Sequence, residues 1–410
     1  MELLTTNNVW MMLCTALVFF MHLGFSFLEI GLTRQKNTIN ILFKNFFIIT
    51  MGLIVYCLVG FNLMYPGDFN IIDSFGGILG FAGPGLDAAA AADLSYNEGY
   101  TYWTDFLFQG MFAATAGTII SGAVAGRIKI NAFMLIVFLY VLIVYPIVGS
   151  WQWGGGFLST FTDEVGFYDF AGSTLVHSVG GWGGLVIIYL LGARKGKFDS
   201  SGKAVAIPGS NIPLSAAGVL ILWLGWFGFN GGSVLSADPA NTSLVLVTTC
   251  LAAAAGGLGA SFLSTLMYKN LDITMFMNGV LGGLVGITAG ADQMGPTSAI
   301  IIGAIGGAVV VLGVALLDKC KLDDPVGAIP VHLFAGIWGT LAVGLFGASA
   351  GFDQFMVQLA STGIVGVFCV IGASIIALIV KSIIGLRVSD EEEETGLDIS
   401  EHGTKAYFSS

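Results

Sequence analysis

Long apolar runs separated by short polar segments follow one another along nearly the whole chain of 410 residues. Each run has about 18 or more residues, which is long enough to cross the hydrocarbon core of a bilayer as a helix. The runs occupy residues 9–30, 39–64, 106–125, 131–149, 172–193, 212–231, 243–267, 273–290, 298–317, 326–347 and 355–384. The pattern predicts an all-α membrane protein with eleven transmembrane helices, followed by a polar tail at 385–410.

The basic residues test this count, because Lys and Arg accumulate in cytoplasmic loops. All 15 of them fall on one predicted side of the membrane, in alternate loops or near the adjoining ends of the spans. They are Arg34, Lys36, Lys44, Arg127, Lys129, Arg194, Lys195, Lys197, Lys203, Lys269, Lys319, Lys321, Lys381, Arg387 and Lys405. The other loops hold acidic residues, such as Asp68 and Asp238. We therefore predict that the N-terminus lies outside and the C-terminus inside, in a cytoplasmic (inner) membrane.

An odd number of spans divides into two groups of five with one helix left over. Because five is odd, the two groups would have opposite orientations, and inverted repeats of this kind place a transport site at the repeat interface. The halves are helices one to five and helices six to ten. His177 lies in the fifth predicted helix and His332 in the tenth, so the two residues occupy equivalent helices.

Composition agrees with a membrane protein, since 55% of the residues are hydrophobic, 10% are charged and the mean hydropathy is +0.86. The net charge of −11 argues against nucleic acid as a partner. Five widely spaced cysteines without a C-x-x-C pair indicate neither a metal cluster nor a disulfide framework. Because no nucleophile–base grouping or phosphate-binding loop is evident, we expect neither an enzyme nor a cofactor.

Ionisable residues inside spans cost about 3 kcal/mol on insertion scales, so each one is a functional candidate. His177 and His332 can be either buried, hydrogen-bonded side chains or part of a pathway, and their equivalent positions favour the pathway. If their rings touch, the facing nitrogens would share one proton. For His22 and Glu29 we favour packing or helix pairing.

Asp169 and several aromatic residues form a second group of candidates. Asp169 precedes a run of small residues, where it can cap a helix or belong to the pathway. Aromatic faces near an entrance can hold a cation by cation–π attraction, but tryptophans also populate the membrane interface in general. The aromatic candidates are Trp151, Trp153, Phe108, Phe112 and Phe229, with Ser233 beside the last of them.

Several motifs occur in an order that resembles one family. They are "GLTRQKN", "DFAGSTLVH", "GWFGFNGGS", "DDPVGAIPVH" and the tail "GLRVSDEEEETGLDISEHGTKAY". Together they resemble the ammonium transporter family (Amt/Mep/Rh), specifically its bacterial Amt branch, from about residue 7 to residue 408.

The resemblance implies a homotrimer with one narrow pore in each subunit. It assigns ammonium recruitment at the outer face to Trp153, Phe112 and Ser233, with Phe108 as a neighbour, and a phenyl gate to Phe112 and Phe229. It assigns the pore and proton relay to His177, His332 and Asp169. Transport of net ammonium would then be electrogenic, with ammonia crossing the dry pore and the proton returning separately.

The acidic tail alone is typical of a solvated charge run. The resemblance implies instead an ordered regulatory cap that contacts neighbouring subunits, on a face where a PII-type signalling protein docks in the family. The tail positions concerned are Gly396, Leu397, Asp398, His402 and Gly403. An ammonium sensor that binds the ion and signals with little transport is the alternative function.

Overall fold

A computed structural model of the chain describes residues 2–162 and 165–407. The described residues are helical, with three isolated β-bridges and no strand. The last three residues of the predicted tail, 408–410, lie outside the described residues. The elements are α1 Glu2–Leu32, η1 Gln35–Asn37, α2 Thr38–Val55, η2 Tyr56–Gly60, α3 Phe61–Met64, η3 Ser74–Gly76, α4 Ala88–Ala92, α5 Tyr102–Ala123, α6 Ile130–Leu139, η4 Tyr140–Val144, α7 Tyr145–Ser150, η5 Ser173–Ser178, α8 Val179–Leu191, α9 Ile212–Gly232, α10 Pro239–Tyr268, α11 Ile273–Ile287, α12 Pro296–Lys319, η6 Ile329–Phe334, α13 Ala335–Phe346, α14 Phe352–Ile384, α15 Asp390–Thr395 and α16 Leu397–His402.

Ten helical units among the described residues are long and apolar enough to cross a membrane. The predicted span 273–290 forms α11, an apolar helix of 15 residues that is shorter than the others. Every predicted run therefore contains a helix, and the all-α prediction is confirmed. Four of the units contain a π-helical turn, at η2, η4, η5 and η6.

Several predicted helix starts are wrong because capping residues begin the helix before its apolar run. Thr101 accepts a hydrogen bond from the Thr104 N–H, so α5 starts at Tyr102 rather than 106. Asp238 accepts from the Asn241 N–H, so α10 starts at Pro239 rather than 243.

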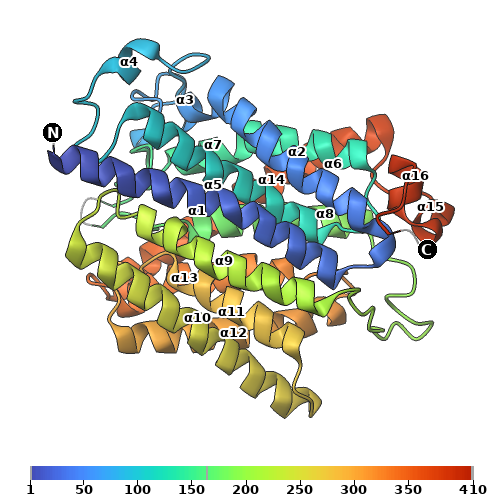
Figure 1. Cartoon of the computed structure of the whole chain (residues 1–410). Coiled ribbons are helices and arrows are strands. Elements are labelled where there is room, and N and C mark those ends of the chain that lie inside the picture. Colours follow the sequence, from blue (N-terminus) through green and yellow to red (C-terminus); the bar gives the residue numbers. More distant parts are fainter. Residues whose placement is uncertain (1, 163–164, 408–410) are drawn as a thin grey trace.

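The helices pack in two groups, with α1 to α8 in one part of the molecule and α9 to α13 in the other, as Figure 1 shows. The long helix α1 lies along α9, and α14 packs against α8 and α13. Where α10, α11 and α12 meet, glycines let the backbones touch. A Cβ at Gly307 would lie 2.0 Å from the carbonyl oxygen of Gly256. Small residues allow this close approach, which supports helix association in lipid.

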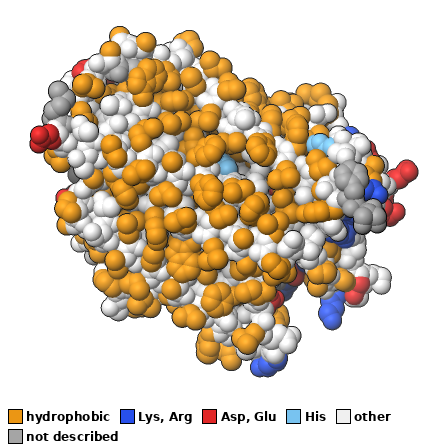
Figure 2. Space-filling model, viewed as in Figure 1, with side chains coloured by type: hydrophobic (Ala, Val, Ile, Leu, Met, Phe, Trp, Pro, Cys, Tyr) orange, Lys and Arg blue, Asp and Glu red, His pale blue; other side chains and the backbone are white. Residues whose placement is uncertain are grey.

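The surface carries the chemistry expected of a membrane protein. Figure 2 shows hydrophobic side chains over most of the visible face, with Lys and Arg gathered toward the end that carries α15 and α16. Large apolar side chains such as Phe262 and Ile383 are exposed on this single chain, at 69% and 67%. Such extensive exposed apolar surface requires lipid or other protein to cover it.

Candidate functional site

The two histidines meet in the interior of the molecule. His177 lies on η5 and His332 on η6, and their Nδ1 atoms are 3.0 Å apart. The rings are nearly parallel, at an angle of 18°, and both side chains are buried. One Nδ1 must carry the proton and the other must accept it, so the pair shares one proton at this contact.

Glycines on the two crossing segments make this contact possible. Gly181 and Gly336 each follow a histidine by four positions. A Cβ at Gly181 would lie 2.7 Å from Leu333 Cβ, and one at Gly336 would lie 2.6 Å from Ser178 Oγ. Each glycine thus faces the residue that follows the other histidine, in a reciprocal arrangement.

An aspartate stands eight positions before each histidine and caps the segment that carries it. Asp169 accepts four backbone N–H bonds, from residues 172–175, at 2.8–2.9 Å. Asp324 likewise accepts from Val326, Gly327 and Ile329. In both turns the third residue after the aspartate is a glycine with positive φ, 106° at Gly172 and 77° at Gly327, a backbone conformation that favours glycine.

Sequence reasoning missed this repeated unit and with it the role of Asp324. The signal was present as D-x-x-G-x-x-x-V-H, which occurs at 169–177 and again at 324–332. Of the two interpretations of Asp169, the geometry favours the cap, because the four N–H groups occupy both carboxylate oxygens. Asp169 is fully buried and lines neither of the cavities described below.

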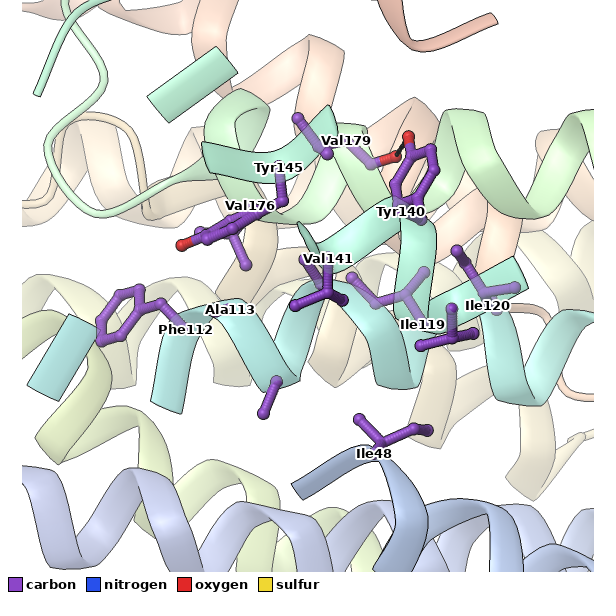
Figure 3. Packing of buried hydrophobic residues seen from close by; sticks show 14 of the residues in the cluster. Ile48, Phe112, Ala113, Ile119, Ile120, Tyr140, Val141, Tyr145, Val176 and Val179 are labelled. Carbon is purple, nitrogen blue, oxygen red and sulfur yellow. Dashed lines mark hydrogen bonds between the residues drawn. The ribbon is translucent and has the colours of Figure 1, made fainter. Parts of the chain in front are cut away.

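A hydrogen bond from a third helix steadies the segment of His177. Tyr140, in η4, donates its hydroxyl to the carbonyl of Val179 at 2.7 Å, two residues beyond His177 (Figure 3). Ile119, Ile120 and Val141 lie around this contact within the buried cluster that Figure 3 draws. The segment that carries His177 is therefore held by packed neighbours on several helices.

The predicted recruitment residues lie together around one cavity of about 150 Å³. We call it the aromatic cavity. Its lining residues are Tyr65, Tyr100, Phe108, Gln109, Phe112, Trp153, Phe170, Ser233 and Leu235. Trp153 donates its indole N–H to the backbone oxygen of Asp169 at 3.0 Å. Trp151 donates instead to Ile78 and does not line this cavity. Sequence reasoning missed Tyr65, Tyr100 and Gln109, which no motif marked.

The predicted gate residues form a stack between the aromatic cavity and the histidines. Phe112 and Phe229 lie 4.1 Å apart, ring centre to ring centre, at 27°. Phe229 is also 5.3 Å from the ring of His177. Trp226 stacks on the same histidine at 5.3 Å and donates to Thr288 at 3.0 Å, which fixes the indole.

A second, smaller cavity of about 20 Å³ lies on the other side of the pair. We call it the carboxylate cavity. Its lining consists of Phe25, Leu28, Glu29, Thr118, Ile119, Gly122, Asn278, Leu281, Val326, Gly327, Ala328, Val331 and His332. Helix α5 contributes to both cavities, with Phe112 at the first and Gly122 at the second. A row of side chains therefore leads from one cavity through the histidines to the other.

The structure gives different surroundings to His22 and Glu29, the two residues for which packing was favoured. Both ring nitrogens of His22 lack a partner among the described residues, and His22 lines neither cavity. Glu29 pairs α1 with α5, because Ser121 Oγ donates to its Oε2 at 2.7 Å. Its Oε1 has no hydrogen-bond partner among the described residues, so helix pairing accounts for only one of the two carboxylate oxygens.

Charged side chains anchor the loops at the basic end. Arg194 binds Asp323 through two nitrogens, at 2.8 and 2.9 Å. The fully buried Arg127 donates to the backbone oxygen of Asp323. Burial alone would raise the pKa of the Asp323 carboxyl, but the hydrogen bonds from Arg194 and the charges of both arginines lower it to about 2.

The predicted tail residues attach the tail to these loops. Asp398 accepts from the backbone N–H of Asn40 in the first turn of α2, and Leu397 donates to Asn37. His402 Nε2 lies 3.3 Å from the side-chain amide of Asn40. Gly396 and Gly403 have positive φ, 109° and 68°, and flank α16.

The side chains offer no cluster for a metal. Within the described residues, no group of three His, Cys, Asp or Glu side chains is placed to hold an ion. The five cysteines are free and scattered. The candidate site therefore consists of aromatic rings, imidazoles and a few buried polar groups.

Comparison with known proteins decides the family. The sequence model of the Ammonium Transporter Family matches residues 9–407. The chain belongs to this family. The ammonium transporter Amt2 of Archaeoglobus fulgidus is 41% identical over 428 residues, which cover 98% of this chain and 88% of the relative. The relatives that carry such names are transporters, not enzymes.

Solved structures have the same fold. A protein named Sensor Amt Protein is 34% identical, with a TM-score of 0.88 over 98% of this chain and all of the other. Mep2 of Candida albicans is 25% identical, with a TM-score of 0.82 over 95% of this chain and 87% of its own. The chain thus has the fold of both a sensor and a Mep protein.

Proposed function

We propose that this protein transports ammonium across the cytoplasmic membrane by carrying ammonia through the histidine pair. The observation that supports this proposal is the row of side chains from the aromatic cavity through Phe112, Phe229, His177 and His332 to the carboxylate cavity. The row gives a small neutral solute imidazole nitrogens to bind and closes the path to a hydrated ion.

The aromatic cavity recruits the ammonium ion. The rings of Trp153, Phe112 and Phe108 line it, and a cation over such faces gains about 2 kcal/mol when partly desolvated. The unpartnered, buried Oε1 of Gln109 offers an acceptor in the same lining. Ser233 donates its hydroxyl to the carbonyl of Phe229, which leaves the oxygen lone pairs for a guest.

The stack of Phe112 and Phe229 separates the ion from the pore. Moving an ion of this size into a medium of dielectric about 4 costs about 20 kcal/mol by the Born estimate, and several kcal/mol after relaxation. Ammonium avoids this cost by losing a proton, since desolvation favours the neutral amine. Potassium has no proton to lose and is excluded.

Ammonia then hydrogen-bonds to the histidine pair. The Nε2 of His177 is buried and has no partner among the described residues, so it can donate to or accept from a guest. The contact between the two Nδ1 atoms provides a proton position inside the pore. The proton that ammonium loses passes to the imidazole pair and leaves on the cytoplasmic side, where it rejoins ammonia, so net ammonium transport is electrogenic. Asp169 positions η5 and Trp153 for this task through its hydrogen bonds to the backbone and to the indole.

The protein acts as a homotrimer with one pore per subunit. Each subunit has eleven spans in a five-plus-five inverted repeat, with the N-terminus outside. The repeated unit of aspartate, glycine and histidine supports the inverted repeat, and the one-sided basic residues support the orientation. The tail, in which Asp398 and His402 of α16 contact Asn40 of α2, regulates the pore and borders the surface where a PII-type protein docks.

A sensor is the second candidate, because the chain covers the whole of the solved Sensor Amt Protein. In that case ammonium would enter the aromatic cavity and change the tail without crossing the pore. The test is the current across reconstituted membranes after an ammonium jump. A saturable current supports transport, whereas binding of ammonium without current would favour the sensor.

A further inference from the structure

The carboxylate cavity contains two hydrogen-bond acceptors with nothing to bind. Glu29 and Asn278 both line it, and the buried Glu29 Oε1 and Asn278 Oδ1 have no hydrogen-bond partner among the described residues. An unpaired buried acceptor costs about 1–3 kcal/mol. Two such atoms around one small cavity indicate a missing guest that donates hydrogen bonds.

The neighbours fix both acceptors in place. Ser121 donates to the other oxygen of Glu29 at 2.7 Å, which holds the carboxylate in place and leaves Oε1 available for a guest. The amide nitrogen of Asn278 donates to the carbonyl of Val326 at 3.1 Å, which leaves its oxygen without a partner. The site is therefore formed before any guest arrives.

The charge of Glu29 is only partly balanced. Lys44 and Asn45 lie near the carboxylate, but the Lys44 ammonium donates to the backbone oxygen of Ser121 at 2.9 Å rather than to Glu29. No cation lies within ion-pair distance of Glu29 among the described residues. A small cation in the cavity can therefore bind the carboxylate directly.

Size and chemistry select the guest. The cavity of about 20 Å³ holds one particle the size of water, since about 10–15 Å³ suffices for a water molecule. Water can donate to both acceptors as well, but only a cation such as ammonium also balances the charge of the carboxylate. His332 lines the same cavity, so a guest leaving the histidine pair enters it directly.

We infer that Glu29 and Asn278 form a second ammonium site, on the cytoplasmic side of the histidine pair. The inference rests on the proposed function insofar as ammonium reaches this cavity through the pore or from the cytoplasm. The carboxylate of Glu29 supplies the charge and Asn278 the second acceptor. The aromatic cavity has no carboxylate in its lining, so the two sites bind the same ion by different means.

The first test is infrared difference spectroscopy of the reconstituted protein with ammonium chloride, and with sodium chloride as the control. We expect ammonium to shift a saturable carboxylate band that is missing in Glu29→Gln. If the band responds to exchange into heavy water but not to ammonium, the cavity holds only water and the inference is wrong.

The second test measures ammonium currents from each face of the membrane. Glu29→Gln should raise the half-saturating ammonium concentration at the cytoplasmic face about tenfold or more, and leave the outer face unchanged. Adding Asn278→Asp to that variant restores a carboxylate to the same cavity and should recover most of the loss. The thermal midpoint of each variant shows that it is folded.

The outcomes separate the two proposals. An unchanged half-saturation in folded Glu29→Gln, or no recovery in the double variant, would overturn the second site while transport stands. Absence of current in the unmodified protein would overturn transport, and the infrared shift would still decide the site.

Discussion

The two sides of the histidine pair have the same scaffold but different linings. On each side an aspartate caps a turn with a positive-φ glycine and places a histidine eight positions later. Toward the aromatic cavity, His177 faces the rings of Phe229 and Trp226. Toward the carboxylate cavity, His332 lies beside Glu29 and Asn278.

The difference shows which features the fold fixes and which it leaves free. Backbone N–H groups buried in the membrane must be satisfied, so both halves need the aspartate and the glycine. The cavity linings make no such contribution to the backbone. They can therefore hold a cation with ring faces on one side and with a carboxylate on the other.

The largest expected effect comes from removing the caps. Asp169→Ala leaves four buried N–H groups without acceptors and should lower the free energy of unfolding by roughly 3 kcal/mol or more. Asp324→Ala should cost less, because Asp324 is half-buried and accepts fewer bonds. Thermal midpoints of the purified variants compare them, and an equal loss at both positions would contradict the argument.

The next effect concerns the ion pair of Arg194 with Asp323, the residue that precedes Asp324. The lowered pKa of Asp323, about 2 instead of 3.8, means that its ionised form stabilises the fold by about 2 kcal/mol. This stabilisation is present above about pH 4 and is lost as the pH falls toward 2. In thermal unfolding at pH 7, Asp323→Asn should therefore have a lower midpoint than the unmodified protein. This difference should shrink as the pH approaches 2. A difference that does not change with pH would rule out this role.

Recruitment by ring faces predicts a smaller effect on the aromatic side. Trp153→Leu removes one ring from the cavity and should raise the half-saturating external ammonium concentration about three- to thirtyfold. Trp103→Leu is the matched control, because Trp103 lies on α5 with 49% of its surface exposed. If currents give equal half-saturating concentrations for Trp153→Leu and this control, Trp153 takes no part in ammonium recruitment.

The smallest expected effect concerns the tail. Asp398→Ala removes the acceptor for the first turn of α2 and should weaken the docking of the tail by about 1 kcal/mol. Faster cleavage of the tail by a protease, with an unchanged thermal midpoint, is the expected result. Unchanged cleavage would mean that other contacts, such as the ion pair of Lys195 with Glu394, hold the tail without Asp398.

Much of the fold could be predicted from the sequence, because apolar runs mark the segments that cross the membrane and basic loops mark one side of it. It also placed Phe112, Phe229, His177 and His332, since these residues fall in recognisable motifs. It did not predict the π-helical turns, which depend on tertiary packing.

Other parts of the site had no sequence signal of their own. Gln109 and Asn278 look like ordinary polar residues until the folded chain leaves their oxygens without partners. Glu29 was interpreted as a packing residue, because only the structure separates its two oxygens. The cap formed by Asp324 was readable, but only by comparing the two halves.

The central claim is that ammonia and its proton cross through the histidine pair. The most direct test compares ammonium and potassium currents of the reconstituted protein with those of His177→Ala. We predict a saturable ammonium current without a potassium current in the unmodified protein, and loss of the ammonium current in folded His177→Ala. An unchanged ammonium current in that variant would contradict the account.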